Sequence, residues 1–129
     1  MVSADAGIWV SFFRNEPAAA DLRVLLDEER VTVHPLVLLD LQLRLRGARR
    51  RQILSDLEHL VATTIEPPEV VSAFIEERGL AKLQVDVMGA QLLASAARQG
   101  DRLWTNDRDL RAAALAMDVA YPASGRESA

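Results

Sequence analysis

The stretch Val2-Ser3-Ala4-Asp5-Ala6-Gly7-Ile8-Trp9 decides the fold of this chain. Its short apolar start predicts a buried strand over residues 2–5 that ends at Asp5. Gly7 then predicts a turn into a short helix over residues 8–13. A carboxylate at the edge of a buried run costs free energy unless another group compensates its charge. Asp5 is therefore a candidate functional residue, although a helix cap is the simpler interpretation of a single aspartate.

Two further stretches repeat this pattern. Residues 34–40 and 103–107 are mostly apolar and end in Asp40 and Asp107. Three such carboxylates in one small domain indicate a shared divalent cation. The chain has no cysteine and only two histidines, so its protein ligands would be mainly carboxylate oxygens. Such ligands favour Mg²⁺ or Mn²⁺.

Hydrophobic periodicity predicts strands that alternate with helices. We expect strands over residues 2–5, 31–34, 63–65, 103–105 and 119–121. We expect helices over residues 8–13, 18–29, 36–45, 49–60, 69–78, 85–97 and 110–117. This alternation predicts an α/β fold with a central, mostly parallel sheet flanked by helices. Ligands bind beyond the carboxyl ends of such strands, so Asp5 and Asp107 converge if their strands are neighbours.

Composition narrows the class of protein. The length of 129 residues predicts one domain, which we place over residues 1–122, with a polar tail over 123–129. The lack of cysteine fits the cytoplasm, and no apolar run is long enough to span a membrane. The net charge of −4 argues mildly against nucleic acid. Against this average, five arginines gather within eight residues: Arg44, Arg46, Arg49, Arg50 and Arg51. They suit phosphate contacts, or form a solvated helix end.

Four motifs lie in order along the chain. They are Asp5-Ala6-Gly7-Ile8-Trp9, His34-Pro35 with the apolar run to Asp40-Leu41, Gln91-Leu92-Leu93-Ala94-Ser95-Ala96, and Leu103-Trp104-Thr105-Asn106-Asp107. With these motifs the chain, from about residue 1 to residue 121, resembles a PIN domain. Within that family it is most similar to the VapC toxins of toxin–antitoxin pairs.

The resemblance implies a PIN-like three-layer fold and a metal-dependent endoribonuclease that hydrolyses RNA. It also implies a cytoplasmic homodimer that a VapB-like antitoxin neutralises. Family members hold Mg²⁺ or Mn²⁺ with four acidic residues. Asp5, Asp40 and Asp107 stand at three of these positions, and Asp86 is a candidate for the fourth. Of these, Asp5 and Asp107 would be the main metal ligands. The RNA-binding residues would be Arg44, Arg46, Arg49 and Arg50.

The chain departs from the family pattern at the site. Asp40 stands where the family has a longer glutamate. Gly89 stands where it has an aspartate, so Asp86, three residues earlier, either replaces that ligand or only caps the helix that follows. We prefer the cap. Ala6 and Gly7 lack the hydroxyls that usually follow Asp5, which would weaken the orientation of the ligands. A second hypothesis is therefore a weakened or silent PIN-fold protein that binds RNA or a protein partner without cleaving.

Overall fold

The computed structural model describes residues 1–122 and forms a parallel sheet covered by helices. The strands are β1 (Val2–Ala4), β2 (Val31–Val33), β3 (Val61–Ala62) and β4 (Arg102–Trp104). The α-helices are α1 (Ala6–Phe13), α2 (Asp21–Asp27), α3 (Pro35–Arg44), α4 (Arg50–Leu57), α5 (Pro68–Arg78), α6 (Val87–Gln99) and α7 (Arg108–Ala116). Two short 3₁₀ helices span η1 (Pro17–Ala19) and η2 (Leu80–Lys82).

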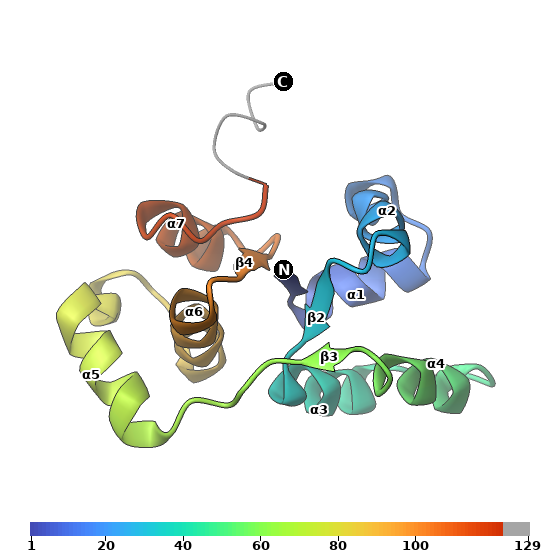
Figure 1. Cartoon of the computed structure of the whole chain (residues 1–129), viewed down its shortest axis with the longest axis horizontal. Coiled ribbons are helices and arrows are strands. Elements are labelled where there is room, and N and C mark those ends of the chain that lie inside the picture. The colour runs from blue at the N-terminus through green and yellow to red at the C-terminus, as the bar shows by residue number, and fades with distance from the viewer. Residues whose placement is uncertain (123–129) are drawn as a thin grey trace.

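The sheet order is β3-β2-β1-β4, and every one of these pairs is parallel. In β1, Val2 pairs with Val31 of β2, and Ala4 pairs with Trp104 of β4. Figure 1 shows α5, α6 and α7 on one side of the strands and α1, α2 and α4 on the other. The predicted α/β fold with a central parallel sheet flanked by helices is confirmed. Since β1 and β4 are neighbours, the residues that follow them meet at one edge.

Polar side chains cap the helices at that edge. Asp5, Asp86 and Asp107 each accept a hydrogen bond from a backbone N–H in the first turn of α1, α6 and α7. His34 does the same for α3 through Nδ1. Such caps satisfy N–H groups that have no partner within their own helix. The same aspartates that are candidate ligands therefore also fix where these helices start.

The core fills both sides of the sheet. Ile8 and Trp9 of α1 and Leu41 of α3 are buried on one side, and α6 is buried from residue 89 to residue 96 on the other. The small residues of α6, such as Ala90 and Ala94, let this helix lie close to its neighbours. A helix buried on most of its surface is expected to be largely apolar, and residues 89–96 of α6 are apolar except for the buried Gln91 and Ser95.

Several boundaries differ from those expected. The strand predicted over 63–65 is wrong, because the ladder is formed by Val61–Ala62 and only the N–H of Thr63 continues it, to Val33 O. The helix predicted over 18–29 is divided into η1 and α2. Gly7 lies inside α1 rather than in a turn before it. The edge strand predicted over 119–121 is reduced to one bridge between Leu103 and Ala120.

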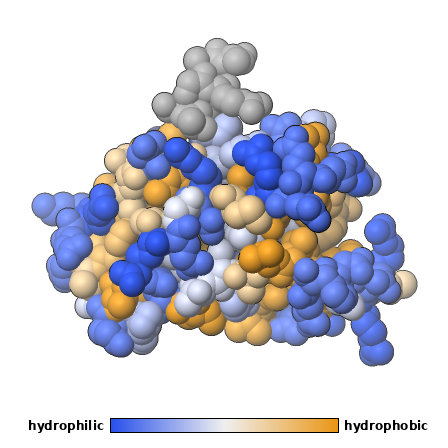
Figure 2. Space-filling model, viewed as in Figure 1, coloured by the Kyte–Doolittle hydropathy of each residue, from blue (hydrophilic) through white to orange (hydrophobic). Residues whose placement is uncertain are grey.

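The surface is mixed in character. On the face shown in Figure 2, hydrophobic residues form separate patches between hydrophilic ones. None of the helices within residues 1–122 is both long and apolar enough to cross a membrane. The tail expected over 123–129 lies outside the described residues, and the domain boundary at residue 122 stays a prediction.

Candidate active site

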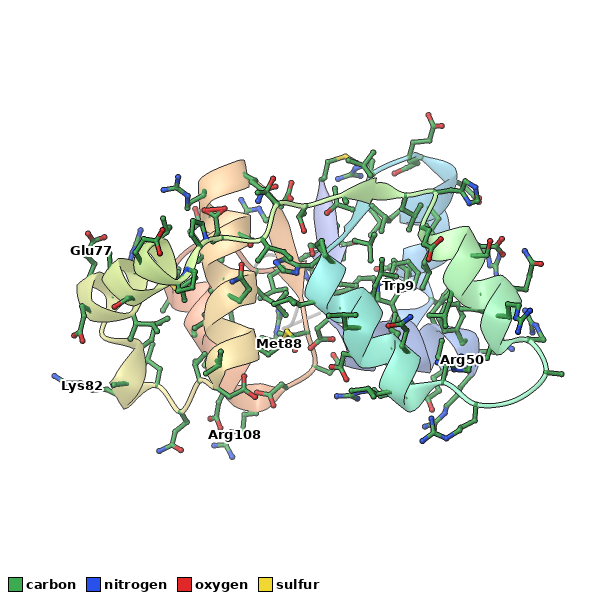
Figure 3. All side chains as sticks on the ribbon, turned by 90° about the horizontal axis from the view of Figure 1, so that it is seen from below. Trp9, Arg50, Glu77, Lys82, Met88 and Arg108 are labelled. Atoms are coloured by element: carbon green, nitrogen blue, oxygen red, sulfur yellow. The ribbon has the colours of Figure 1, made fainter. Side chains whose placement is uncertain are left out.

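A cavity of about 740 Å³ opens where the carboxyl ends of β1 and β4 face the helices α3 and α6. All four aspartates of the predicted catalytic set, Asp5, Asp40, Asp86 and Asp107, line it. Figure 3 looks from below at the two groups of helices, with Met88 and Arg108 on one side and Trp9 and Arg50 on the other. Met88 belongs to the lining as well. The chain thus brings carboxylates that are up to about a hundred residues apart into one cavity.

Asp5 is the most constrained of the four. Its Oδ1 accepts a hydrogen bond from Ile8 N at 3.0 Å, and its Oδ2 accepts one from Thr105 Oγ1. Burial raises the pKa of the Asp5 carboxyl above its ordinary value, and the neighbouring Asp107 adds to this rise. The two hydrogen bonds and the charge of Arg44 act in the opposite direction. Asp5 is therefore a carboxylate whose charge is costly and in need of compensation.

Thr105 connects the first and the last motif. Its hydroxyl donates to Asp5 and accepts from Asp107 N at 3.0 Å. The sequence analysis did not assign this role, although Thr105 lies two residues before Asp107 in the closing motif. The hydroxyl that Ala6 and Gly7 fail to provide next to Asp5 is thus supplied from β4. Asp107 itself is exposed and caps α7 through a bond from Leu110 N at 2.9 Å.

Asp40 forms an ion pair with an arginine of its own helix. Arg44 Nε lies 2.9 Å from Asp40 Oδ1, one turn further along α3. Arg44 also lines the cavity. The second acidic position therefore faces the cavity together with a positive charge.

Asp86 is the N-cap of α6, as preferred from the sequence, because the helix begins at Val87. Its Oδ1 accepts from Gly89 N at 2.8 Å. The cap does not remove Asp86 from the cavity, which both Asp86 and Gly89 line. Whether Asp86 acts as a ligand stays a prediction.

The donor set fits an oxygen-binding cation such as Mg²⁺. Five carboxylates line the cavity, those of the four predicted aspartates and that of Asp109, and no cysteine or histidine does. Among residues 1–122, no three histidine or acidic side chains lie close enough together to hold one ion. Mg²⁺ commonly takes one or two carboxylates and completes its shell with water and substrate phosphate, so a pair such as Asp5 and Asp107 meets this requirement.

The four arginines predicted to bind RNA lie in different surroundings. Arg44 faces the cavity, whereas Arg46 and Arg50 donate to backbone carbonyls of residues 42, 43 and 45 near the end of α3. Basic side chains at a helix C-terminus satisfy free carbonyls and interact favourably with the helix dipole. Arg49 lines a different cavity. The structure therefore brings one of the four arginines, Arg44, to the aspartates.

A buried polar network supports α3 behind the cavity. His34 Nδ1 accepts from Leu36 N at 3.0 Å, so Nε2 carries the proton and points to Ser95 Oγ at 3.1 Å and Gln91 Oε1 at 3.4 Å. Gln91 also bonds both backbone groups of Glu66. Burial lowers the pKa of His34, while Gln91 and the charge of Glu66 act to raise it. His34 is thus part of a structural hydrogen-bond network.

A second cavity, of about 340 Å³, lies between α1, α2 and α4, away from the aspartates. Its apolar lining includes Trp9, Phe12, Phe13 and Ile53. The indole N–H of Trp9 is buried and has no hydrogen-bond partner among the described residues. An unsatisfied buried donor costs about 1–3 kcal/mol.

A parallel α/β domain with an acidic cavity beyond its central strands defines the class of protein to which this chain belongs. The PIN domain family matches residues 3–115, so the chain is a member of the PIN domain family. The resemblance found in the sequence is confirmed.

Similar proteins narrow the comparison further. The chain is 32% identical over 124 residues to Ribonuclease VapC32 of Mycobacterium tuberculosis, an alignment that covers 93% of this chain and 95% of that protein. Two crystal structures share the fold at lower identity. PAE2754 from Pyrobaculum aerophilum has a TM-score of 0.60 and 19% identity, and the alignment covers 95% of this chain and 86% of that chain. FitAcB from Neisseria gonorrhoeae has a TM-score of 0.63 and 18% identity, and the alignment covers 93% of this chain and 95% of that chain.

Proposed function

We propose that this PIN-domain protein is a VapC-like toxin, a metal-dependent endoribonuclease that hydrolyses phosphodiester bonds of RNA. The observation that carries the proposal is the shared cavity of Asp5, Asp40, Asp86 and Asp107. The similarity to a VapC ribonuclease over nearly the whole chain supports the reaction type. The cofactor is Mg²⁺, or Mn²⁺ in its place.

Asp5 and Asp107 would hold the metal ion. Each oxygen of Asp5 accepts one hydrogen bond and keeps a lone pair for a ligand bond. When bound, the ion lowers the pKa of a coordinated water and stabilises negative charge on the phosphate. Thr105 orients the Asp5 carboxylate and ties it to the backbone of Asp107, which is the supporting role expected of groups around a metal ligand.

The remaining residues would position the substrate. Asp40 would assist directly or through water, since its arm is short. Asp86 is the fourth acidic candidate. Arg44 would bind a phosphate next to the scissile bond, and Arg46, Arg49 and Arg50 would contact the RNA backbone further away. The bonds of Arg46 and Arg50 to carbonyls leave further N–H donors on each guanidinium for this contact.

The test is cleavage of a labelled RNA by the purified protein. We expect product with Mg²⁺ or Mn²⁺, loss of product with EDTA, and loss in Asp5→Asn. Asp101→Asn is the control, because Asp101 is another aspartate with a raised pKa but lies at the opposite end of β4 and contacts the amino terminus. Cleavage that persists in Asp5→Asn or in EDTA would contradict the mechanism.

We propose further that the cognate antitoxin places an apolar segment in the Trp9 cavity. The apolar and aromatic lining of this cavity supports the proposal. We expect Ile53→Asp to weaken the affinity for the co-expressed antitoxin, and Val24→Asp, on the exposed surface of α2, to leave it unchanged. Equal affinities would place the antitoxin elsewhere.

The homodimer and the cytoplasmic location remain part of the proposal. Apolar Leu39 and Leu43 of α3 and Val87 of α6 are exposed around the acidic cavity, and exposed apolar side chains gathered in one region favour association. Light scattering of the wild-type protein and of Leu43→Glu tests this assembly. Loss of the dimer is expected in the variant.

The silent PIN-fold protein stays as a second candidate because Gly89 offers no carboxylate. It predicts no cleavage and weak metal binding. A Cβ at position 89 would lie 2.8 Å from Val85 Cγ1, so the test belongs in a Val85→Ala background. There, Gly89→Asp is compared with Gly89→Asn. A gain of metal affinity with the aspartate alone indicates a damaged family site, and no gain favours a rearranged or abandoned one.

A further inference from the structure

The ion pair of Arg44 and Asp40 places a fixed positive charge in the acidic cavity. Nε of Arg44 binds Oδ1 of Asp40 at 2.9 Å, and both residues line the cavity with Asp5. The Asp40 side chain is 26% exposed and that of Arg44 is 52% exposed. The pair is thus formed at the rim, where it can be broken without burying an uncompensated charge.

The charge of Arg44 reaches beyond its partner. The same charge also stabilises the ionised form of Asp5. Arg44 therefore acts on two of the four predicted aspartates, Asp40 and Asp5. A divalent cation in the cavity would experience the same two carboxylates together with the repulsion of the guanidinium. Two cations near the same carboxylates compete because each lowers the negative potential that attracts the other.

An RNA phosphate is an alternative partner for the Arg44 guanidinium. Arginine binds phosphate through a planar fork of N–H donors, which makes such pairs often bidentate. The bond to Asp40 engages Nε alone among the contacts of this side chain in the described chain. An exposed ion pair one helical turn apart contributes only about 0.3–0.5 kcal/mol, so an RNA phosphate can displace Asp40 from Arg44.

We propose that Arg44 is a built-in counter-cation in the acidic cavity. An RNA phosphate binds its guanidinium in place of Asp40, and Asp40 then becomes available to the metal ion. This inference rests on the proposed metal-dependent ribonuclease activity. Without RNA, Arg44 holds Asp40 and weakens divalent-cation binding. When RNA binds, its phosphate takes the guanidinium, Asp40 is released toward the cation, and the two ligands bind with positive coupling. Arg44 is a positioning residue in this scheme, and its effect on the metal acts through Asp40 and the cavity charge.

The experiment measures Mn²⁺ affinity directly, by the free-ion EPR signal, with and without a short phosphorothioate oligoribonucleotide. RNA-only samples correct for Mn²⁺ bound by the oligonucleotide. Without RNA, we expect Arg44→Gln to bind Mn²⁺ about three- to tenfold more tightly than wild type, as loss of a nearby like charge should produce. The oligonucleotide should tighten Mn²⁺ binding to wild type and lose this effect in Arg44→Gln.

Three variants serve as controls. Arg30→Gln removes the same charge from an arginine whose ion pair with Glu28 does not line the cavity, and Arg44→Lys keeps the charge, so without RNA both should bind Mn²⁺ like wild type. In an Asp40→Asn background, Arg44→Gln should lose part of its effect. Thermal unfolding of each variant confirms that it is folded.

The outcomes separate this inference from the proposed function. Mn²⁺ binding that is equal or weaker in Arg44→Gln than in wild type overturns the exchange and leaves metal dependence intact. An identical gain in Arg30→Gln also overturns it, because a general charge effect would then suffice. Absence of Mn²⁺ binding in wild type and Arg44→Gln alike overturns both the exchange and the proposed metal-dependent activity.

Discussion

We predict that Gly89→Ala does not stabilise the protein, although alanine usually stabilises a helix relative to glycine. Gly89 is the third residue of α6 after the Asp86 cap. Replacing glycine by alanine in an open helical position gains about 1 kcal/mol. Here a Cβ would lie 2.8 Å from Val85 Cγ1 and 3.2 Å from Leu110 Cδ1, and overpacking of this kind costs about 1–3 kcal/mol. We therefore expect Gly89→Ala to be neutral or to lower the free energy of unfolding by up to about 2 kcal/mol.

Urea unfolding followed by circular dichroism measures this change in a double-mutant cycle. Val85→Ala removes the atom that stands closest to the new Cβ. In that background Gly89→Ala should become stabilising, with a coupling energy of about 1 kcal/mol or more between the two positions. If Gly89→Ala alone stabilises the protein by about 1 kcal/mol, as helix propensity by itself predicts, the space around Gly89 is open and the steric argument is refuted.

Three further predictions concern charge and hydrogen bonding. Burial raises the pKa of Asp5 above 3.8, so its ionised form destabilises the fold at neutral pH. Asp5→Asn should therefore raise the melting temperature in EDTA. The difference in melting temperature from wild type should increase as the pH rises through the native pKa of Asp5. The pKa of His34 is lowered by burial, so its neutral form stabilises the fold above about pH 6.5. The free energy of unfolding should fall as the pH drops below that value. This pH-dependent loss should be absent in His34→Gln. Gln91→Leu leaves both backbone groups of Glu66 without this partner and should lower the free energy of unfolding by about 2–4 kcal/mol, measured in urea; a loss under 1 kcal/mol would show that water replaces the amide.

Local patterns sufficed for the fold because each strand ends in a distinct signal. Asp5, Pro35 and Asp107 mark where β1, β2 and β4 give way to helices. The short strand Val61–Ala62 was misplaced because two residues are too few to show a periodicity of their own, and the β-branched run Thr63-Thr64-Ile65 follows them directly. A strand of two residues at the edge of a sheet is set by its neighbour β2 and not by its own sequence.

The site was predictable in its acids and not in their partners. Asp5, Asp40, Asp86 and Asp107 were identified from motifs, since each stands at a helix start or within a conspicuous apolar run. Thr105 was missed as the partner of Asp5, because a hydrogen bond across 100 residues depends on the pairing of β1 with β4. The Gln91 network depends in the same way on α6 lying next to the segment before α5.

Arg44 differs from these long-range cases because its partner lies only four residues away in the sequence. It was grouped with the arginines that follow it, as part of a basic block. The spacing of four residues from Asp40 predicts an ion pair on one helix face, which is the arrangement observed. Charged residues that follow a candidate ligand by one helical turn should therefore be evaluated first as its partners. In this chain the pair with Asp40 is the observation on which the proposed exchange between RNA phosphate and metal ion rests.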